Sequence, residues 1–365
     1  MASAASIIRH LDRSRYEPVP IRIEKDGRWT LADKPPTAVS AADVIEQMRL
    51  DTARPVRHRR EAHLVAYPAD ETILTLERRG GVDEDHAVSV TGLRLDVVFP
   101  VLHGPYGEDG TVQGLLELAN VPYVGAGVLG SAVGMDKGVM KTLFAAAGLP
   151  IVPHLVVLRP EWARDADGVT ARVAGALRYP VFVKPANLGS SVGISKAASD
   201  AEFAAAMALA LQFDRKIVIE SAVPHAREIE CAVLGNDAPD ASVPGEIVSA
   251  REFYDYEAKY LDSGSTPIIP APLSEPQVAE IQRLSIAAFR AVEGAGMSRV
   301  DFLLARETGA LYVNEVNTIP GFTTISMYPK MWEASGLSYA GLLDRLIALA
   351  LERHAEKQQL RTSIT

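Results

Sequence analysis

Residues 299–321 constrain the fold of this chain more than any other stretch. Two runs rich in Val and Leu flank the polar residues 307–309, the last of which is Gly309. A three-residue hairpin loop needs a left-handed residue at such a place, and glycine adopts that conformation without strain. The stretch therefore predicts a β-hairpin in which Arg306 faces Ala310, followed by a tight turn.

The same register gathers polar side chains on one face of the hairpin. It pairs Asp301 with Glu315 and Arg299 with Asn317, and the two-residue period of a strand puts all four side chains on the same side. Two carboxylates opposite each other in a strand pair repel. Divalent cations would remove that conflict, and Asp, Glu and Asn oxygens are the ligands that hard cations prefer. We therefore predict a metal site at Asp301, Glu315 and Asn317, with a solvated acidic face as the alternative.

Bulk properties exclude several classes of protein. A chain of 365 residues corresponds to about two to three domains. Its net charge of −9 argues against binding to a nucleic-acid backbone. A single cysteine, Cys231, excludes an intrachain disulfide, and no apolar run has the length of a signal peptide or a membrane span. We therefore expect a cytoplasmic protein with no nucleic-acid or membrane partner.

A glycine-rich loop follows an apolar run in the first third of the chain. Residues 96–102 predict a buried strand, residues 103–110 a polar loop that begins with His103, and a helix is expected from Thr111. In α/β proteins, a polar loop at the carboxyl end of a strand commonly binds a ligand. An ordinary acidic turn would explain the glycines but not the histidine and two acids among them, so both interpretations stay open.

The glycines at positions 125, 127 and 130 match the G-x-G-x-x-G pattern of dinucleotide-binding proteins. That pattern needs an acidic residue about twenty positions further on to hold the ribose. After Asp136 the next acid is Glu161, so a nicotinamide-dependent dehydrogenase is disfavoured and we predict a turn into a helix at 131–147. Lys137 and Lys141 share one face of this helix, and we interpret Lys141 as an ordinary surface lysine.

Two further segments predict contacts with phosphates. Lys184 ends a very apolar strand, and the small residues 189–193 follow it. Small residues let backbone N–H groups approach a phosphate closely, although a plain hairpin turn is the alternative. The aromatic and charged residues 253–261 predict a lid over the site.

Taken together, these motifs resemble those of D-alanine–D-alanine ligases in the ATP-grasp superfamily. The matching residues occur in the family's order and cover nearly the whole chain: 103–114, 135–137, 183–185, 189–193, 254–260, 299–301 and 314–329. The resemblance implies an α/β fold, with an N-terminal doubly wound (Rossmann-like) domain at 1–136 that binds substrate. A two-subdomain ATP-grasp fold would follow, with a central part at 137–220 and a C-terminal part at 221–365.

The resemblance also implies a reaction. ATP would phosphorylate the carboxylate of one D-alanine, and the amine of a second D-alanine would attack the acylphosphate, giving D-alanyl-D-alanine for peptidoglycan precursors. Two Mg²⁺ or Mn²⁺ ions, held by Asp301, Glu315 and Asn317, would assist phosphoryl transfer. The family further implies a homodimer.

Individual roles follow from matching the family's motifs. The phosphate oxygens would be neutralised by Lys137, Lys184 and Lys259. The rest of the nucleotide would be contacted by Ser191, Glu220, Ala222, Val223, Glu228 and Phe253, with Glu220 at the adenine and Glu228 at the ribose. The reacting groups would be held by Arg299, Gly321, Ser326, Ser190, Tyr260 and His103. Among these, Arg299 and the Gly321 N–H would stabilise the oxyanion, and Ser326 would hold the second substrate's carboxylate.

One feature of the family is missing from the sequence. Family members open with an apolar strand, a Gly-Gly loop and a Glu-His-x-Val-Ser segment before the helix that begins here near Ser3, and that glutamate receives the first D-alanine's ammonium. We therefore expect the polypeptide as given to be weakly active or inactive, and a non-catalytic ATP-binding relative is an alternative. A ligase for other amino or hydroxy acids is another. The pair Lys259–Tyr260 favours the dipeptide, because in the family it accompanies dipeptide rather than D-alanyl-D-lactate synthesis.

Overall fold

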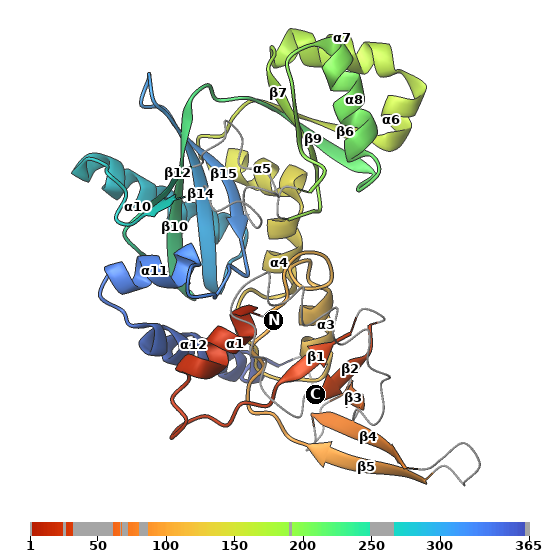
Figure 1. The fold of residues 1–365 in the computed structure, drawn as a ribbon, viewed down its shortest axis with the longest axis vertical. Helices are drawn as coiled ribbons and strands as arrows, with labels where there is room; N and C mark the ends of the chain where they lie inside the picture. Colours follow the sequence, from red (N-terminus) through yellow and green to blue (C-terminus); the bar gives the residue numbers. More distant parts are fainter. Residues whose placement is uncertain are drawn as a thin grey trace.

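The computed structural model describes residues 2–24, 27–31, 61–65, 67, 72–79, 87–189, 192–248 and 266–361. Among these residues, three β-sheets follow one another along the chain (Figure 1). The N-terminal part contains a five-stranded antiparallel sheet in the order β1-β2-β3-β4-β5. Its elements are α1 (Ala2–His10), β1 (Ile21–Ile23), β2 (Trp29–Leu31), β3 (Glu61–Leu64), β4 (Ile73–Arg79), β5 (Ala87–Leu93), α3 (Thr111–Leu118) and α4 (Val128–Met135).

The strand predicted at 96–102 does not form. Its only pairing among the described residues is a single parallel bridge between Val98 and Tyr123, in which the Val98 N–H donates to Pro122 O at 2.8 Å. Pro100 lacks an N–H and interrupts any longer ladder. Residues 97–102 are nevertheless buried or half-buried, so the loop at His103 keeps its predicted position after an apolar run.

The central sheet has the order β6-β9-β7-β8. Its elements are β6 (His154–Leu158), α6 (Arg159–Arg164), α7 (Ala166–Ala176), β7 (Val181–Pro185), β8 (Ser195–Ala197), α8 (Asp200–Ala210) and β9 (Lys216–Ser221). Val173 and Phe203 pack from the helices onto Val183 and Ile219 of the strands, forming a core of their own. Lys184 stands at the end of β7, as predicted.

The C-terminal sheet is antiparallel, with the order β13-β12-β10-β14-β15 and β11 paired to β10. Its elements are β10 (Ala226–Gly235), β11 (Asp240–Ala241), β12 (Gly245–Val248), β13 (Thr266–Ile268), α10 (Glu275–Ala291), β14 (Gly296–Ala305), β15 (Leu311–Asn317), α11 (Met327–Ala334) and α12 (Tyr339–Gln358). Alternate residues of β10 enter different cores. Cys231 lies in the core that contains α10, whereas Ala232 lies in the core that contains α11 and α12, so the sheet is covered on both faces.

The helix predicted at 131–147 is two helices, α4 and α5 (Lys137–Ala146). The chain leaves helical geometry at Asp136, whose carboxylate accepts the N–H groups of Gly138 and Val139 at 3.1 Å each and so caps α5. Helix α5 lies between the central and C-terminal sheets and contacts both β9 and β15 (Figure 1). It therefore carries its two lysines into the space between them.

In the part of the chain that the structure describes, no single helix is long and apolar enough to cross a membrane. Helices α11 and α12 satisfy the criterion only together, and they are bent by 106° relative to each other.

Candidate functional site

The hairpin of β14 and β15 has the predicted register where it matters for the site. Asp301 faces Glu315 and Arg299 faces Asn317, and Gly309 adopts the left-handed conformation with φ 69°. The predicted pairing of Arg306 with Ala310 is wrong, because the register shifts by one residue between Asp301 and Phe302. A β-bulge at Asn314 absorbs the extra residue, and the Ala305 N–H then donates to Ala310 O at the loop.

The facing carboxylates are neutralised by basic side chains of the protein itself. Arg299 Nε and Nη2 each donate to one carboxylate oxygen of Asp301 at 2.7 Å. Lys137 Nζ lies 3.2 Å from Glu315 Oε2. Arg299 Nε also lies 3.2 Å from Glu230 Oε2. Burial alone would lower the pKa of Arg299, but Asp301 and Glu230 raise it well above its usual value. The expectation that a divalent cation relieves the repulsion between the two carboxylates is therefore corrected: Arg299 and Lys137 already relieve it.

The face still offers the donor set that a hard cation requires. Asn317 Nδ2 donates to Asp301 Oδ2 at 3.0 Å, which directs the amide oxygen of Asn317 away from that carboxylate. Within the described ranges, no three His, Cys, Asp or Glu side chains gather into a metal-binding group. Mg²⁺ is commonly held by one or two carboxylates together with phosphate oxygens and water, so two carboxylates and an amide fit Mg²⁺ used with a nucleotide.

A pocket opens over this face. Its lining includes Glu108, Lys137, Glu315 and Asn317, together with the backbone at Leu188 and Gly189. Lys137 Nζ donates to Leu188 O at 2.9 Å and lies 3.2 Å from Glu315, so the lysine joins the C-terminal sheet to the loop after β7. A cation, the Glu315 carboxylate of the sheet, the Glu108 carboxyl group and the start of a small-residue loop thus meet where the sequence predicted phosphate binding.

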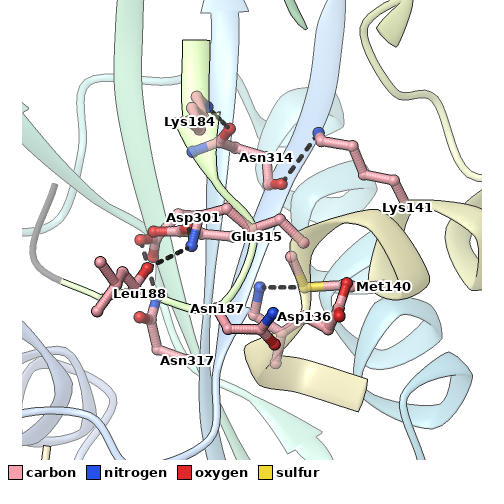
Figure 2. A network of polar contacts seen from close by, with 12 residues as sticks. Asp136, Met140, Lys141, Lys184, Asn187, Leu188, Asp301, Asn314, Glu315 and Asn317 are labelled. Carbon is pink, nitrogen blue, oxygen red and sulfur yellow. Dashed lines mark hydrogen bonds and ion pairs between the residues drawn. The ribbon is translucent and has the colours of Figure 1, made fainter. Parts of the chain in front are cut away.

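A second charged cluster lies deeper between the two sheets. Glu220 is bound on both sides, with Oε2 at 2.7 Å from Lys184 Nζ and Oε1 at 3.1 Å from Lys141 Nζ. The lysines also reach the bulged residue Asn314: Lys184 Nζ lies 3.4 Å from its side-chain oxygen, and Lys141 Nζ donates to its backbone oxygen at 3.3 Å (Figure 2). The prediction that Lys141 is a surface lysine is wrong, because the residue is fully buried.

The pairing explains the electrostatics of this cluster. Burial would raise the pKa of Glu220, but Lys141 and Lys184 lower it to about 2. Burial lowers the pKa of Lys141, and Glu220 opposes that effect only in part. For Lys184 the attraction of Glu220 outweighs burial, and its pKa is raised. Glu220 is therefore ionised at neutral pH and holds a cation on each side.

The loop at His103 meets the turn after β15. His103 Nδ1 lies 3.1 Å from Ile319 O, which identifies Nδ1 as the protonated nitrogen, and burial lowers the pKa of the ring. Glu108 accepts the N–H groups of Gly104 at 2.6 Å and Ile319 at 3.3 Å. The predicted loop therefore reaches the residues beside Gly321, which lie far away in sequence.

Gly321 and Ser326 also lie together. Ser326 Oγ accepts the Thr323 N–H at 3.0 Å, and a Cβ placed on Gly321 would come within 2.8 Å of that oxygen. Only glycine fits this approach without displacing the serine. The structure thus places Gly321, Ser326 and His103 around one turn at the open end of the hairpin.

Other predicted residues have different surroundings. The Ala222 N–H donates to Pro180 O at 3.1 Å, Val223 follows it after β9, and Glu228 lies in β10 opposite Ile247 and Leu303. The remaining predicted positions lie outside the described residues: Ser190, Ser191, Phe253, Lys259 and Tyr260.

The sequence interpretation missed three residues of the charged clusters. These are Lys141, Asn314 and Glu230. Lys141 carried a usable signal, since it lies one helical turn from Lys137 on the same face and is followed by the apolar residues of α5. Asn314 had none, because a bulge is not visible in the alternation of a strand as short as β15.

Comparisons with known proteins agree over both halves of the chain. The family described as "D-ala D-ala ligase N-terminus" matches residues 1–126, and "D-ala D-ala ligase C-terminus" matches residues 143–348. A protein named D-alanine–D-alanine ligase from Heliobacterium modesticaldum is 50% identical over 362 residues, which is 99% of this chain and 93% of the relative.

Two solved structures are similar in fold and sequence. The D-alanine–D-alanine ligase of Coxiella burnetii has a TM-score of 0.78 and 37% identity, and the match covers 98% of this chain and 91% of that one. The VanG D-Ala:D-Ser ligase of Enterococcus faecalis also has a TM-score of 0.78, with 31% identity and coverage of 96% and 94%. Together with the antiparallel sheets, these matches confirm an α/β fold with an N-terminal domain followed by an ATP-grasp fold. The doubly wound arrangement expected for residues 1–136 is not seen among the described residues, because all five strands of their sheet pair in antiparallel order.

Proposed function

Since the chain belongs to the D-alanine–D-alanine ligase family, we propose that it joins two D-alanine molecules in an ATP-dependent, ADP-forming reaction that supplies peptidoglycan precursors. The observation that carries the proposal is the agreement between family membership and the polar face of β14 and β15. That face combines two carboxylates, an amide and two basic side chains beside a pocket. Phosphoryl transfer depends mainly on such positioning and charge neutralisation.

The basic residues would serve the phosphates. Lys137 and Lys184 stand on two sides of the space between the sheets, each bound to a carboxylate that a nucleotide phosphate would replace. Asp301, Glu315 and Asn317 would hold two Mg²⁺ or Mn²⁺ ions, which, when bound, supply Lewis-acid stabilisation of the phosphate oxygens. Once Lys137 binds the nucleotide instead of Glu315, the Glu315 carboxylate would become able to bind a metal ion.

The turn at the open end of the hairpin would serve the amino acids. Arg299 and the Gly321 N–H would stabilise the oxyanion that forms when the second amine attacks the acylphosphate. Ser326 would hold the second substrate's carboxylate, and His103 would contact substrate from the facing loop. Ser190 and Tyr260 would orient the first D-alanine. The nucleotide would be contacted by Lys259, Ser191, Phe253, Ala222, Val223, Glu228 and, at the adenine, Glu220.

The decisive measurement is phosphate release with ATP, Mg²⁺ and D-alanine, with L-alanine as the control. We expect release with the D isomer only, and no release from either would refute the ligase and favour a non-catalytic ATP-binding protein. Product analysis with D-alanine mixed with D-serine or D-lactate tests the second substrate. D-Alanyl-D-alanine should predominate at neutral pH, and a mixed product in excess would assign the chain to ligases like the D-Ala:D-Ser relative.

The metal assignment has its own test. We expect Asp301→Ala and Glu315→Ala each to lower ligation by at least about 100-fold, because each removes an anionic ligand from the nucleotide-bound metals. Circular dichroism should show that both variants stay folded. Glu307→Ala, in the exposed hairpin loop, is the matched control and should retain full activity. Near-wild-type turnover of either site variant at limiting Mg²⁺ would show that the metals lie elsewhere.

The proposal includes a homodimer in the cytoplasm, where ATP is supplied. Light scattering coupled to size-exclusion chromatography measures the oligomeric state. A mass near the chain's 39.3 kDa would exclude the dimer.

A further inference from the structure

Two lysines share one buried glutamate, and they differ in what else they can reach. Glu220 is 2% exposed and lies between the ammonium groups of Lys141 and Lys184. The side chain of Lys141 is 1% exposed, whereas that of Lys184 is 11% exposed at the end of β7. A ligand in the space between the sheets can therefore approach Lys184 but not Lys141.

Two buried ammonium groups share one carboxylate in direct contact, that of Glu220. Asn314 adds neutral acceptors to both lysines, and the charges of Glu315 and Glu228 also attract Lys184. A buried charge is stable only with compensation. An anion that enters beside Lys184 would supply that compensation, provided that Glu220 keeps a cation of its own.

We propose that Lys141 is a positioning residue that acts through Glu220: it stays bound to this carboxylate and so frees Lys184 to bind the phosphates of the nucleotide. This inference rests on the proposed ligase function. Lys141 is held in place by its ion pair with Glu220 Oε1 at 3.1 Å and by its hydrogen bond to the backbone oxygen of Asn314 at 3.3 Å. Without Lys141, Lys184 would be the sole cation on a buried carboxylate, and moving it to a phosphate would leave Glu220 uncompensated.

The test measures nucleotide binding separately from catalysis. Titration calorimetry with ADP and Mg²⁺ gives Kd, and steady-state phosphate release gives kcat together with KM for ATP and for D-alanine. We expect Lys141→Met to raise both Kd for ADP and KM for ATP by about tenfold or more, with KM for D-alanine unchanged. Lys141→Arg keeps the charge and should restore most of the affinity. Lys196→Met, an exposed lysine of the same sheet, is the matched control and should bind as the wild type does.

A double variant separates this role from a general packing role. Glu220→Gln removes the charge that Lys141 compensates, so adding Lys141→Met to it should weaken ADP binding by less than twofold beyond Glu220→Gln alone. If Lys141→Met does not fold, Lys141→Gln, which keeps a hydrogen-bond donor for Glu220, enters the same comparison.

Two results would overturn the proposal. One is a neutral variant at position 141 that binds ADP with wild-type affinity. The other is a double variant whose Kd for ADP rises by the product of the increases caused by Lys141→Met and Glu220→Gln alone. Inactivity of the wild type with every amino acid would instead refute the ligase function, and ADP titration would still measure the role of Lys141.

Discussion

Glu108 has a carboxyl group whose pKa the structure moves to neutral pH. Its carboxyl group lies between the loop at His103 and the turn after β15, where it accepts the N–H groups of Gly104 and Ile319. Burial raises the pKa of Glu108 to about 7, although both N–H donors favour the ionised form. In the folded protein this group therefore keeps its proton up to a higher pH than it does in the unfolded chain.

The raised pKa predicts a pH dependence of stability. Between the ordinary value of 4.5 and about 7, the folded state binds a proton that the unfolded state has released. The contribution to the free energy of unfolding is complete below the lower value and is lost as pH rises through the upper one, a change on the order of 3 kcal/mol. Urea unfolding of the ligand-free, metal-free protein from pH 5 to pH 8 should show this loss.

Glu108→Gln is the corresponding variant. It cannot titrate and offers one acceptor oxygen in place of two, so it should be less stable than the wild type at pH 5 and should show a flatter pH profile. Glu307→Gln, a carboxyl group in the exposed hairpin loop, should leave the profile unchanged. A Glu108→Gln profile parallel to that of the wild type would show that another group is responsible.

At the scale of the element, the cap of α5 links stability to the site. Asp136 caps a helix that begins with Lys137, and its second oxygen pairs with Lys216 of β9. Asp165 caps α7 by accepting the Gly168 N–H at 2.9 Å, on a helix that carries no site residue. Both aspartates therefore cap the N-terminus of a helix, but only the helix capped by Asp136 carries residues of the site.

This contrast predicts different functional effects for the same substitution. Asp136→Ala and Asp165→Ala should each lower the free energy of unfolding, by about 1–2 kcal/mol, because each leaves backbone N–H groups of a first helical turn without an acceptor. Only Asp136→Ala should raise KM for ATP, since it loosens the turn that carries Lys137. An equal change of KM in both variants would mean that stability alone determines nucleotide affinity.

The elements also show how far sequence reasoning reaches. Strand alternation predicted which side chains of β14 and β15 share a face, and the pairs of Asp301 with Glu315 and Arg299 with Asn317 form as expected. The pairing expected next to the loop does not form, and the bulge compensates for that difference of one residue. The bulge at Asn314 and the burial of Lys141 could not be predicted, since both depend on contact with Glu220 and Lys184 from another sheet. The strand expected at 96–102 failed for a local reason, Pro100, that an apolar pattern alone does not weigh.

At the scale of the whole molecule, the C-terminal helix α12 contacts the segment at Tyr123 and Gly125, which precedes α4. The Arg353 guanidinium lies 4.6 Å from the centre of the Tyr123 ring, and it donates to Tyr123 O at 3.1 Å and to Gly125 O. Burial lowers the pKa of Arg353 without removing its charge. Arg345, on the same helix, is exposed and lies 3.7 Å from Glu352.

We predict unequal costs for two identical substitutions on α12. Arg353→Ala should lower the free energy of unfolding by about 2–4 kcal/mol, because it leaves two carbonyl groups without a donor and removes a cation–π contact. Arg345→Ala should change it by less than about 0.5 kcal/mol, as exposed ion pairs usually do. The urea concentrations at the unfolding midpoints of the two variants provide the comparison. Equal midpoints would show that the contacts of Arg353 with Tyr123 and Gly125 do not stabilise the fold.

The first helix shares a core with that same region. Ile7 of α1 packs with Leu342 and Leu346 of α12, His10 stacks on Tyr339, and Ser3 Oγ accepts the Phe322 N–H at 3.2 Å. On a ribosome, the N-terminal helix emerges long before these partners exist. A nascent chain must therefore carry it exposed until synthesis has passed residue 350, and the turn at Gly321 cannot be seated earlier. For this protein, the turn at Gly321 is complete only once α12 is available to the folding chain, and α1 keeps its apolar side chains uncovered until then.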